Sequence, residues 1–258
     1  MEEKFKSEGK CLFCNKTFTK AGISRHVATH LKEKSETEKS GNSFLLKVET
    51  TKRWSSSPYF LSLWVDGEAT MKTIDKFLRD IWLECCGHMS AFRNPKIQHK
   101  RGKVLSMTDV FDYLERRSSV KNKKMMESST GEVPMVRKAK DALYSGLVLE
   151  YDYDFGSTTK LDITVIGEYQ IKADKKVVLV SRNEPLQIVC AICKKVPATQ
   201  ICTICMYNEH AEFCERCAPK HAKKCADFED YASMPVVNSP RMGVCGYVGG
   251  RIDKERDR

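Results

Sequence analysis

Cysteine pairs separated by two residues recur in the last third of the chain. The pairs are Cys190 with Cys193, Cys202 with Cys205, and Cys214 with Cys217, and they are followed by His221 and Cys225. Thiolate and imidazole groups are the ligands that zinc prefers, and a two-residue gap lets one tight turn present two sulfurs to one ion. Seven cysteines and one histidine fill two tetrahedral sites, so this segment predicts two zinc ions.

The spacing of the pairs predicts how the ligands are shared between the two ions. Eight residues separate consecutive pairs, fewer than the roughly 15 to 20 residues of a zinc ribbon that uses adjacent pairs. We therefore expect a crossed arrangement that resembles the small cross-brace fingers of the MYND and HIT types. One ion would be held by Cys190, Cys193, Cys214 and Cys217, and the other by Cys202, Cys205, His221 and Cys225. His210 is an alternative to His221, and a disulfide framework is the competing interpretation, although such frameworks belong to oxidising compartments.

A third set of ligands lies near the N-terminus. Cys11 and Cys14 form another two-residue pair, and His26 and His30 are four residues apart and so lie on one helical face. This pattern resembles a two-cysteine, two-histidine zinc finger, with Phe18 as an apolar core residue. The gap from Cys14 to His26 is 11 residues, one fewer than the usual number of about 12. A third structural zinc ion is predicted here.

Whether such a finger reads DNA is a separate question. If His26 is the seventh helical residue, the positions that contact bases in this family fall on Thr19, Gly22 and Arg25. Only Arg25 could form a bidentate contact to guanine. The alternative is a zinc-stapled cap that contacts protein.

Basic residues are concentrated between the two cysteine-rich ends. The chain carries a formal net charge of +10, and residues 93–140 contain 13 basic and 5 acidic residues. A concentrated positive patch attracts phosphates and other polyanions. The candidate nucleic-acid contacts are Arg25, Lys100, Arg101, Lys103, Arg116 and Arg117. The alternative is a solvated, partly disordered loop.

The middle of the chain has the pattern of a folded α+β domain. Strands are predicted over 44–48, 59–65, 88–92, 147–153, 161–166 and 176–181, and helices over 71–85, with Thr70 as the candidate cap, and over 107–117. We expect a central mixed sheet with helices on one face, flanked by an N-terminal ββα finger and a C-terminal cross-brace module. The expected divisions are a finger (1–32), a linker (33–42), the α+β domain (43–183), a double-zinc module (188–226) and a tail (227–258).

Two runs in this domain carry a family resemblance. Residues 75–93 read DKFLRDIWLECCGHMSAFR, and residues 149–165 read LEYDYDFGSTTKLDITV. They resemble the Ri-plasmid ORF-three-like family, whose members are often labelled as insertion-element passenger or resolvase-like proteins. The resemblance covers about residues 43–183, and the tail run NSPRMGVCGY, residues 238–247, resembles some members as well. It implies an association with mobile elements but no settled biochemical activity.

Two further patterns suggest catalysis but lack the partners that it needs. Asp154-Phe155-Gly156 matches the magnesium-binding tripeptide of protein kinases, yet the chain has no glycine-rich phosphate loop. It is better explained as a turn in which Gly156 has a positive φ, with a binding role for the turn as a further hypothesis.

Cys85 and Cys86 beside His88 could form a nucleophile pair, but a buried cysteine usually acts as a small hydrophobe. A metal centre of these three residues with His99 is disfavoured because adjacent cysteines point apart along a helix, and Cys245 is left unassigned.

We therefore predict a non-catalytic protein with three structural zinc ions. The absence of a long apolar run and of an N-terminal apolar segment predicts a cytoplasmic protein that does not enter membranes. Association with nucleic acid is the first expected function, and a protein-interaction adaptor that uses the C-terminal module is the alternative. The identity of the partner, a ligand of the central domain, the oligomeric state and the pathway stay open.

Overall fold

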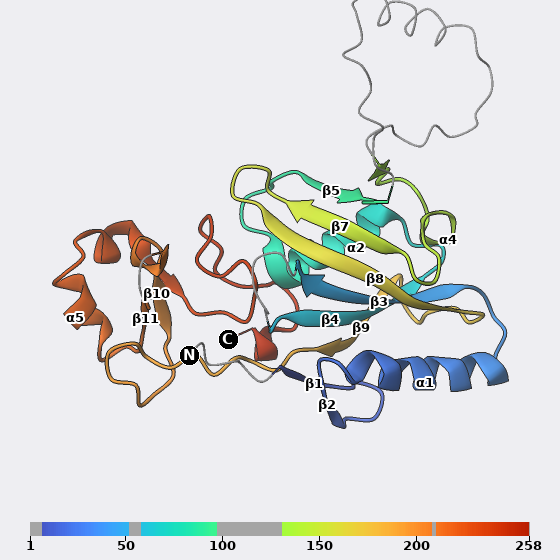
Figure 1. Ribbon diagram of the computed structural model, residues 1–258, viewed down its shortest axis with the longest axis horizontal. Coiled ribbons are helices and arrows are strands. Elements are labelled where there is room, and N and C mark those ends of the chain that lie inside the picture. Colours follow the sequence, from blue (N-terminus) through green and yellow to red (C-terminus); the bar gives the residue numbers. More distant parts are fainter. Residues whose placement is uncertain (1–6, 52–57, 97–130, 208–209, 258) are drawn as a thin grey trace, which may run out of the picture.

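The computed structural model describes residues 7–51, 58–96, 131–207 and 210–257, and its largest unit is a seven-stranded sheet (Figure 1). The strand order is β6-β5-β7-β8-β3-β4-β9. The strands are β3 (Ser43–Thr50), β4 (Phe60–Asp66), β5 (Ser90–Arg93), β6 (Glu132–Val133), β7 (Val148–Tyr153), β8 (Thr159–Tyr169) and β9 (Val177–Arg182). Every neighbouring pair is antiparallel. The expected mixed sheet is therefore wrong, because strands that run in the same direction, such as β4 and β5 on either side of α2, are not neighbours in the sheet.

Helices lie on both faces of this sheet, not on one. Strand β4 is buried along its whole length, and its alternate side chains enter two different cores: Leu61 and Leu63 face one side, and Phe60 and Trp64 face the other. The first core is covered by α2 (Met71–Leu78) and the following π-helical turn η1 (Arg79–Leu83). Thr70 begins α2 as expected, since its Oγ1 accepts a hydrogen bond from the N–H of Thr73 at 3.2 Å.

The second core is covered by the N-terminal finger. The finger consists of β1 (Glu8–Lys10), β2 (Thr17–Thr19) and the helix α1 (Ile23–Thr37), which runs alongside the sheet in Figure 1. Ile23, Val27 and Leu31 recur on one face of α1 and are fully buried against Trp64 and its neighbours. Helix α1 continues into the segment 33–42 that its composition predicts as a linker. The finger is thus packed onto the central domain as part of its core.

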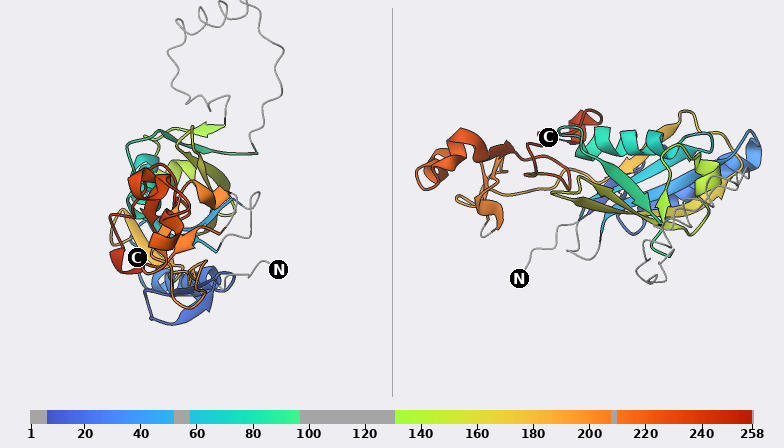
Figure 2. Two further views of the ribbon diagram at one scale, coloured as in Figure 1. Left: turned by 90° about the vertical axis from the view of Figure 1, so that its left-hand side faces the viewer. Right: turned by 90° about the horizontal axis from the view of Figure 1, so that it is seen from above.

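The cysteine-rich segment forms a small module beyond one end of the sheet, as Figure 1 and the right view of Figure 2 show. Its three-stranded sheet has the order β11-β10-β12. The elements are β10 (Gln200–Cys202), η2 (Cys205–Tyr207), β11 (Glu212–Phe213), α5 (Ala218–Ala222), η3 (Phe228–Ala232) and β12 (Ser233–Pro235). Its apolar core is small, with Phe213 and Phe228 as the largest buried side chains. Such a core needs additional cross-links for stability.

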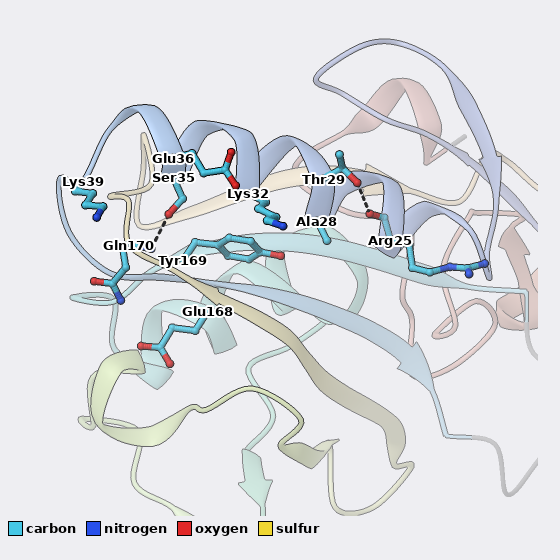
Figure 3. A pocket seen from close by; sticks show the side chains of 10 residues that line it. All are labelled: Arg25, Ala28, Thr29, Lys32, Ser35, Glu36, Lys39, Glu168, Tyr169 and Gln170. Atoms are coloured by element: carbon cyan, nitrogen blue, oxygen red, sulfur yellow. Dashed lines mark hydrogen bonds between the residues drawn. The ribbon is translucent and has the colours of Figure 1, made fainter.

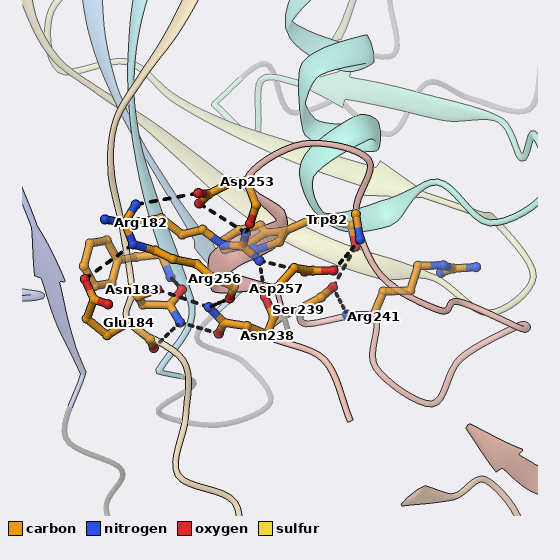
Figure 4. A network of polar contacts seen from close by, with 12 residues as sticks. Trp82, Arg182, Asn183, Glu184, Asn238, Ser239, Arg241, Asp253, Arg256 and Asp257 are labelled. Carbon is orange, nitrogen blue, oxygen red and sulfur yellow. Dashed lines mark hydrogen bonds and ion pairs between the residues drawn. The ribbon is translucent and has the colours of Figure 1, made fainter. Parts of the chain in front are cut away.

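The tail after β12 returns to the central domain and ends in the short helix η4 (Lys254–Arg256). Arg182, at the end of β9, is fully buried and donates to Asp257 Oδ1 at 2.9 Å and to the carbonyl of Asn238 at 2.5 Å (Figure 4). Ser239 donates to the carbonyl of Trp82 at 2.7 Å. The tail is therefore fastened to both η1 and β9 by buried polar contacts.

Two small elements of the central domain were not predicted from the sequence, and one predicted element cannot be placed. The additional elements are β6 and the helix α4 (Ala139–Ala142). They are short and lack a clear periodic pattern. The helix predicted over 107–117 lies outside the described residues.

Candidate metal centres

The finger brings its four predicted ligands together. Cys11 and Cys14 lie in the loop between β1 and β2, and His26 and His30 lie on successive turns of α1. All four ligand atoms are within 4.8 Å of one another. Nε2 of His26 is 3.1 Å from the sulfur of Cys14 and 3.2 Å from Nε2 of His30. Burial, together with the neighbouring His30, lowers the pKa of His26, which favours the neutral imidazole that a metal requires.

The start of α1 changes which residues fall on the positions that contact bases in two-cysteine, two-histidine fingers. Helix α1 begins at Ile23, so His26 is its fourth residue and not its seventh. The positions numbered −1, 3 and 6 from the helix start therefore fall on Gly22, Arg25 and Ala28. Arg25 remains the one residue of the three with a side chain that can donate to a base, and it is exposed.

The C-terminal module groups its ligands in the crossed pairing that the spacing predicts. One set is Cys190, Cys193, Cys214 and Cys217; the other is Cys202, Cys205, His221 and Cys225; within each set the ligand atoms lie within 4.8 Å. The sulfurs of Cys193 and Cys214 are 4.0 Å apart, and those of Cys202 and Cys225 are 3.9 Å apart. His221 stacks on Phe213 with ring centroids 4.2 Å apart. His210 is exposed and belongs to neither set.

The electrostatics of the first set fit a cation held by thiolates. Burial raises the pKa of the Cys190 thiol, but backbone N–H groups of Cys193, Cys214 and Ile192 outweigh it and lower that pKa to about 6. Burial and the neighbouring sulfurs raise the pKa of Cys217 to about 12. A thiolate at Cys217 is thus costly beside the other sulfurs until a positive ion neutralises them.

A fourth cluster contains three residues that were disfavoured as metal ligands from the sequence, together with Cys245, which was left unassigned. The sulfurs of Cys85, Cys86 and Cys245 and the imidazole of His88 lie within 4.8 Å of one another. The objection that adjacent cysteines diverge along a helix fails because η1 ends at Leu83, and both cysteines lie in the bend that follows. His99, the fourth ligand considered from the sequence, lies outside the described residues. The sequence did carry one signal for this cluster. Cys85, Cys86 and Cys245 are the cysteines that remain after the ligands of the three predicted zinc sites have been assigned.

The fourth cluster does not have the geometry of a nucleophile, base and acid. Nε2 of His88 is 3.0 Å from the sulfur of Cys86 and 3.5 Å from Oδ2 of Asp154. In a catalytic triad the nucleophile and the carboxylate contact different nitrogens of the histidine ring, whereas here both lie near Nε2. The arrangement is one in which several ligands converge on a common point.

The Asp154-Phe155-Gly156 turn has a structural use in this chain. Its positive φ of 64° falls on Asp154 and not, as expected, on Gly156. One carboxylate oxygen accepts the N–H of Gly156 at 3.0 Å, and the other accepts Nη2 of the buried Arg241 at 2.6 Å. The hydrogen bond from Arg241 lowers the pKa of Asp154. The Asp154 carboxylate is therefore already used to hold the tail residue Arg241.

The predicted basic contacts are only partly placed. Arg25 lies exposed on α1, while Lys100, Arg101, Lys103, Arg116 and Arg117 lie outside the described residues. Among the helices of the described ranges, none is long and apolar enough to cross a bilayer.

The fold and the four clusters define an α+β protein with Cys/His sites that suggest structural zinc ions. No protein-family model matches the chain, and no curated protein matches it. A solved structure of a protein of unknown function, MM3350 from Methanosarcina mazei Go1, is similar to it at 14% identity and a TM-score of 0.35. That match covers 55% of this chain and 68% of the other. The resemblance of residues 43–183 to the Ri-plasmid ORF-three-like family thus stays an expectation.

Proposed function

We propose that this chain is a non-catalytic, zinc-stabilised adaptor that binds a protein partner through its C-terminal cysteine-rich module. Residues 188–232 carry half of the large apolar side chains that are exposed in the described ranges: Val189, Ile192, Val196, Ile204, Tyr207 and Tyr231. Exposed apolar groups gathered on one small module are typical of an interaction surface. This concentration is the observation that carries the proposal.

The zinc turns explain why two of these side chains, Ile192 and Ile204, face outward. Ile192 and Ile204 occupy the same place in two successive turns, directly before the second cysteine of each pair, and each is 43% exposed. The two cysteine sulfurs of each turn converge on the ion site, and the isoleucine before the second cysteine is left exposed. Both isoleucines can therefore contact a partner without any change in the module.

The proposed adaptor role predicts a specific loss of binding. In the zinc-loaded full chain, changing Ile192→Ser and Ile204→Ser together should weaken partner capture at least tenfold, because apolar contacts at the centre of an interface dominate its affinity. Capture would be measured after nuclease treatment and at high salt. The matched control is Val136→Ser, whose side chain is 81% exposed between β6 and α4. Binding that disappears at high salt, or that falls equally in the control, would exclude the module as the docking surface.

Association with nucleic acid is the second candidate, and the outer face of α1 favours it. A groove of about 880 Å³ lies between α1 and the end of β8 (Figure 3). Arg25 and Lys32 line it from the helix and Lys39 from the segment that follows, with Glu36 and Glu168 as acidic neighbours. These basic side chains are exposed, and Arg25 and Lys32 lie about two turns apart on α1, so that both could contact one phosphate backbone.

This candidate has its own test. The variant Arg25→Ala with Lys32→Ala should lower affinity for a short DNA duplex and reduce the slope of log affinity against log salt by roughly 2, because two phosphate contacts are removed. Lys72→Ala is the control, since this exposed lysine lies on α2, on the opposite face of the sheet. A wild-type affinity that does not change with salt would rule this function out.

A further inference from the structure

We propose that a fourth zinc site is formed by Cys85, Cys86, His88 and Cys245. Its ion holds the C-terminal tail against the central domain, and it exchanges more readily than the ions of the other three sites. Three thiolates and one imidazole are a common ligand set of structural zinc. The ligands come from two segments 159 residues apart at Cys86 and Cys245. The site would therefore join the end of η1 to the tail.

The spacing of the four ligand atoms fits a single tetrahedral ion. Two sulfurs bound to one zinc at about 2.3 Å lie about 3.8 Å apart in a tetrahedron. Here the sulfur of Cys86 is 3.6 Å from that of Cys85 and 3.7 Å from that of Cys245. Nε2 of His88 is 3.0 Å and 3.2 Å from the sulfurs of Cys86 and Cys245. The separations in the finger and in the cross-brace are similar, at 3.1 Å between Cys14 and His26 and 3.9 Å between Cys202 and Cys225.

The use of cysteine in the chain supports the same conclusion. All twelve cysteines are free thiols, and each belongs to one of the four clusters. Each cluster has four ligands, which is the number that a structural zinc site takes. No cysteine is left over once the fourth site is included.

The backbone conformation of the tail places Cys245 at this site. This residue has a φ of 50°, a conformation that costs a non-glycine residue free energy, and it stands between Gly243 and Gly246, which also have positive φ. Arg241 fixes the start of this turn through Asp154, and its Nη2 is 3.5 Å from the sulfur of Cys85. Three thiolates and one zinc ion carry a net negative charge, which the guanidinium of Arg241 partly balances.

Exposure distinguishes this site from the others. Cys86 and Cys245 are exposed, whereas every ligand in the other three clusters is buried or partly buried. A chelator or a competing thiol can therefore reach this ion directly, without local unfolding. The expected consequence is a zinc ion that leaves first and frees the tail around Cys245, while the finger and the cross-brace keep theirs.

Native mass spectrometry of the zinc-loaded full chain tests the proposal. The wild type should hold four zinc ions and lose one of them at the lowest chelator concentration. Cys245→Ser and Cys86→Ser should each hold three, without the early loss, and Met89→Ala should behave as the wild type because this neighbour is exposed and is not a ligand. Cobalt titration gives a second count, since each thiolate site adds a sulfur-to-metal absorption band.

Hydrogen exchange tests whether the ion holds the tail against the central domain. Release of the first zinc should increase amide exchange at residues 242–247 at least tenfold and leave residues 190–225 unchanged. The proposal would be overturned by a wild type that binds three ions, or by a Cys245→Ser variant that binds as many ions as the wild type. A disulfide between Cys86 and Cys245 in zinc-loaded protein kept with a reductant would overturn it as well. None of these results depends on the partner of the cysteine-rich module, so failure here is separate from failure of the adaptor role.

Discussion

Removing all zinc should unfold the C-terminal module while the central sheet and most of α1 stay folded. The module has a small apolar core around Phe213 and Phe228, and zinc bound to small finger domains contributes apparent free energies of about 10–16 kcal/mol. Without the ions such a core is too small to fold alone. Segment-resolved hydrogen exchange before and after strong chelation should show that residues 190–225 lose their amide protection almost completely.

The finger should respond differently, although its ligands are as complete as those of the module. Ile23, Val27 and Leu31 are buried in a core shared with Trp64 of the central sheet, so α1 keeps its apolar contacts when the ion leaves. We expect α1 to lose part of its protection and the cross-brace nearly all of it, with recovery on addition of zinc. Equal loss in the two regions would show that the contacts with the sheet contribute little to the finger.

Changing Arg182→Met should destabilise the protein by about 3–5 kcal/mol and detach the tail. Arg182 is fully buried, and the carboxylate of Asp257 that it binds is nearly so. Removing one partner of a buried pair leaves the other charge without compensation, at a cost in that range. The carbonyl of Asn238 loses a donor as well (Figure 4). Denaturant unfolding would measure the free energy, and proteolysis would report release of residues 236–257.

Two further variants separate charge burial from simple loss of packing. Arg256→Met lies in the same network, but its ion pairs are longer, at 3.5 Å to Glu184 and 3.7 Å to Asp253, and it is partly exposed. It should cost less than about 1 kcal/mol. Combining Arg182→Met with Asp257→Leu should recover part of the loss, because no unpaired charge remains. If the double variant is no more stable than Arg182→Met alone, the uncompensated carboxylate is not the cause.

Much of the local structure follows from the sequence because it depends on spacing within a few residues. The apolar stripe from Met71 predicts α2, and Thr70 begins it as expected. The pairs that lead to Cys193, Cys205 and Cys217, eight residues apart, are enough to predict the crossed grouping that the structure has. Turns and helical faces are short-range features, so a single sequence specifies them.

Contacts between distant segments were decided only by the tertiary structure. The apolar run of β4 is nearly continuous, as in a strand buried on both faces, but it does not show that α1 of the finger covers one of them, and helices on one face were expected. Cys245 meets Cys86 across 159 residues because buried pairs from Arg182 and Arg241 fold the tail back onto η1 and β9. The sequence by itself determined the kinds of ligand and the spacing of three sites, whereas the fourth set and the antiparallel order of the sheet depend on long-range packing, which has no periodic signal along the chain.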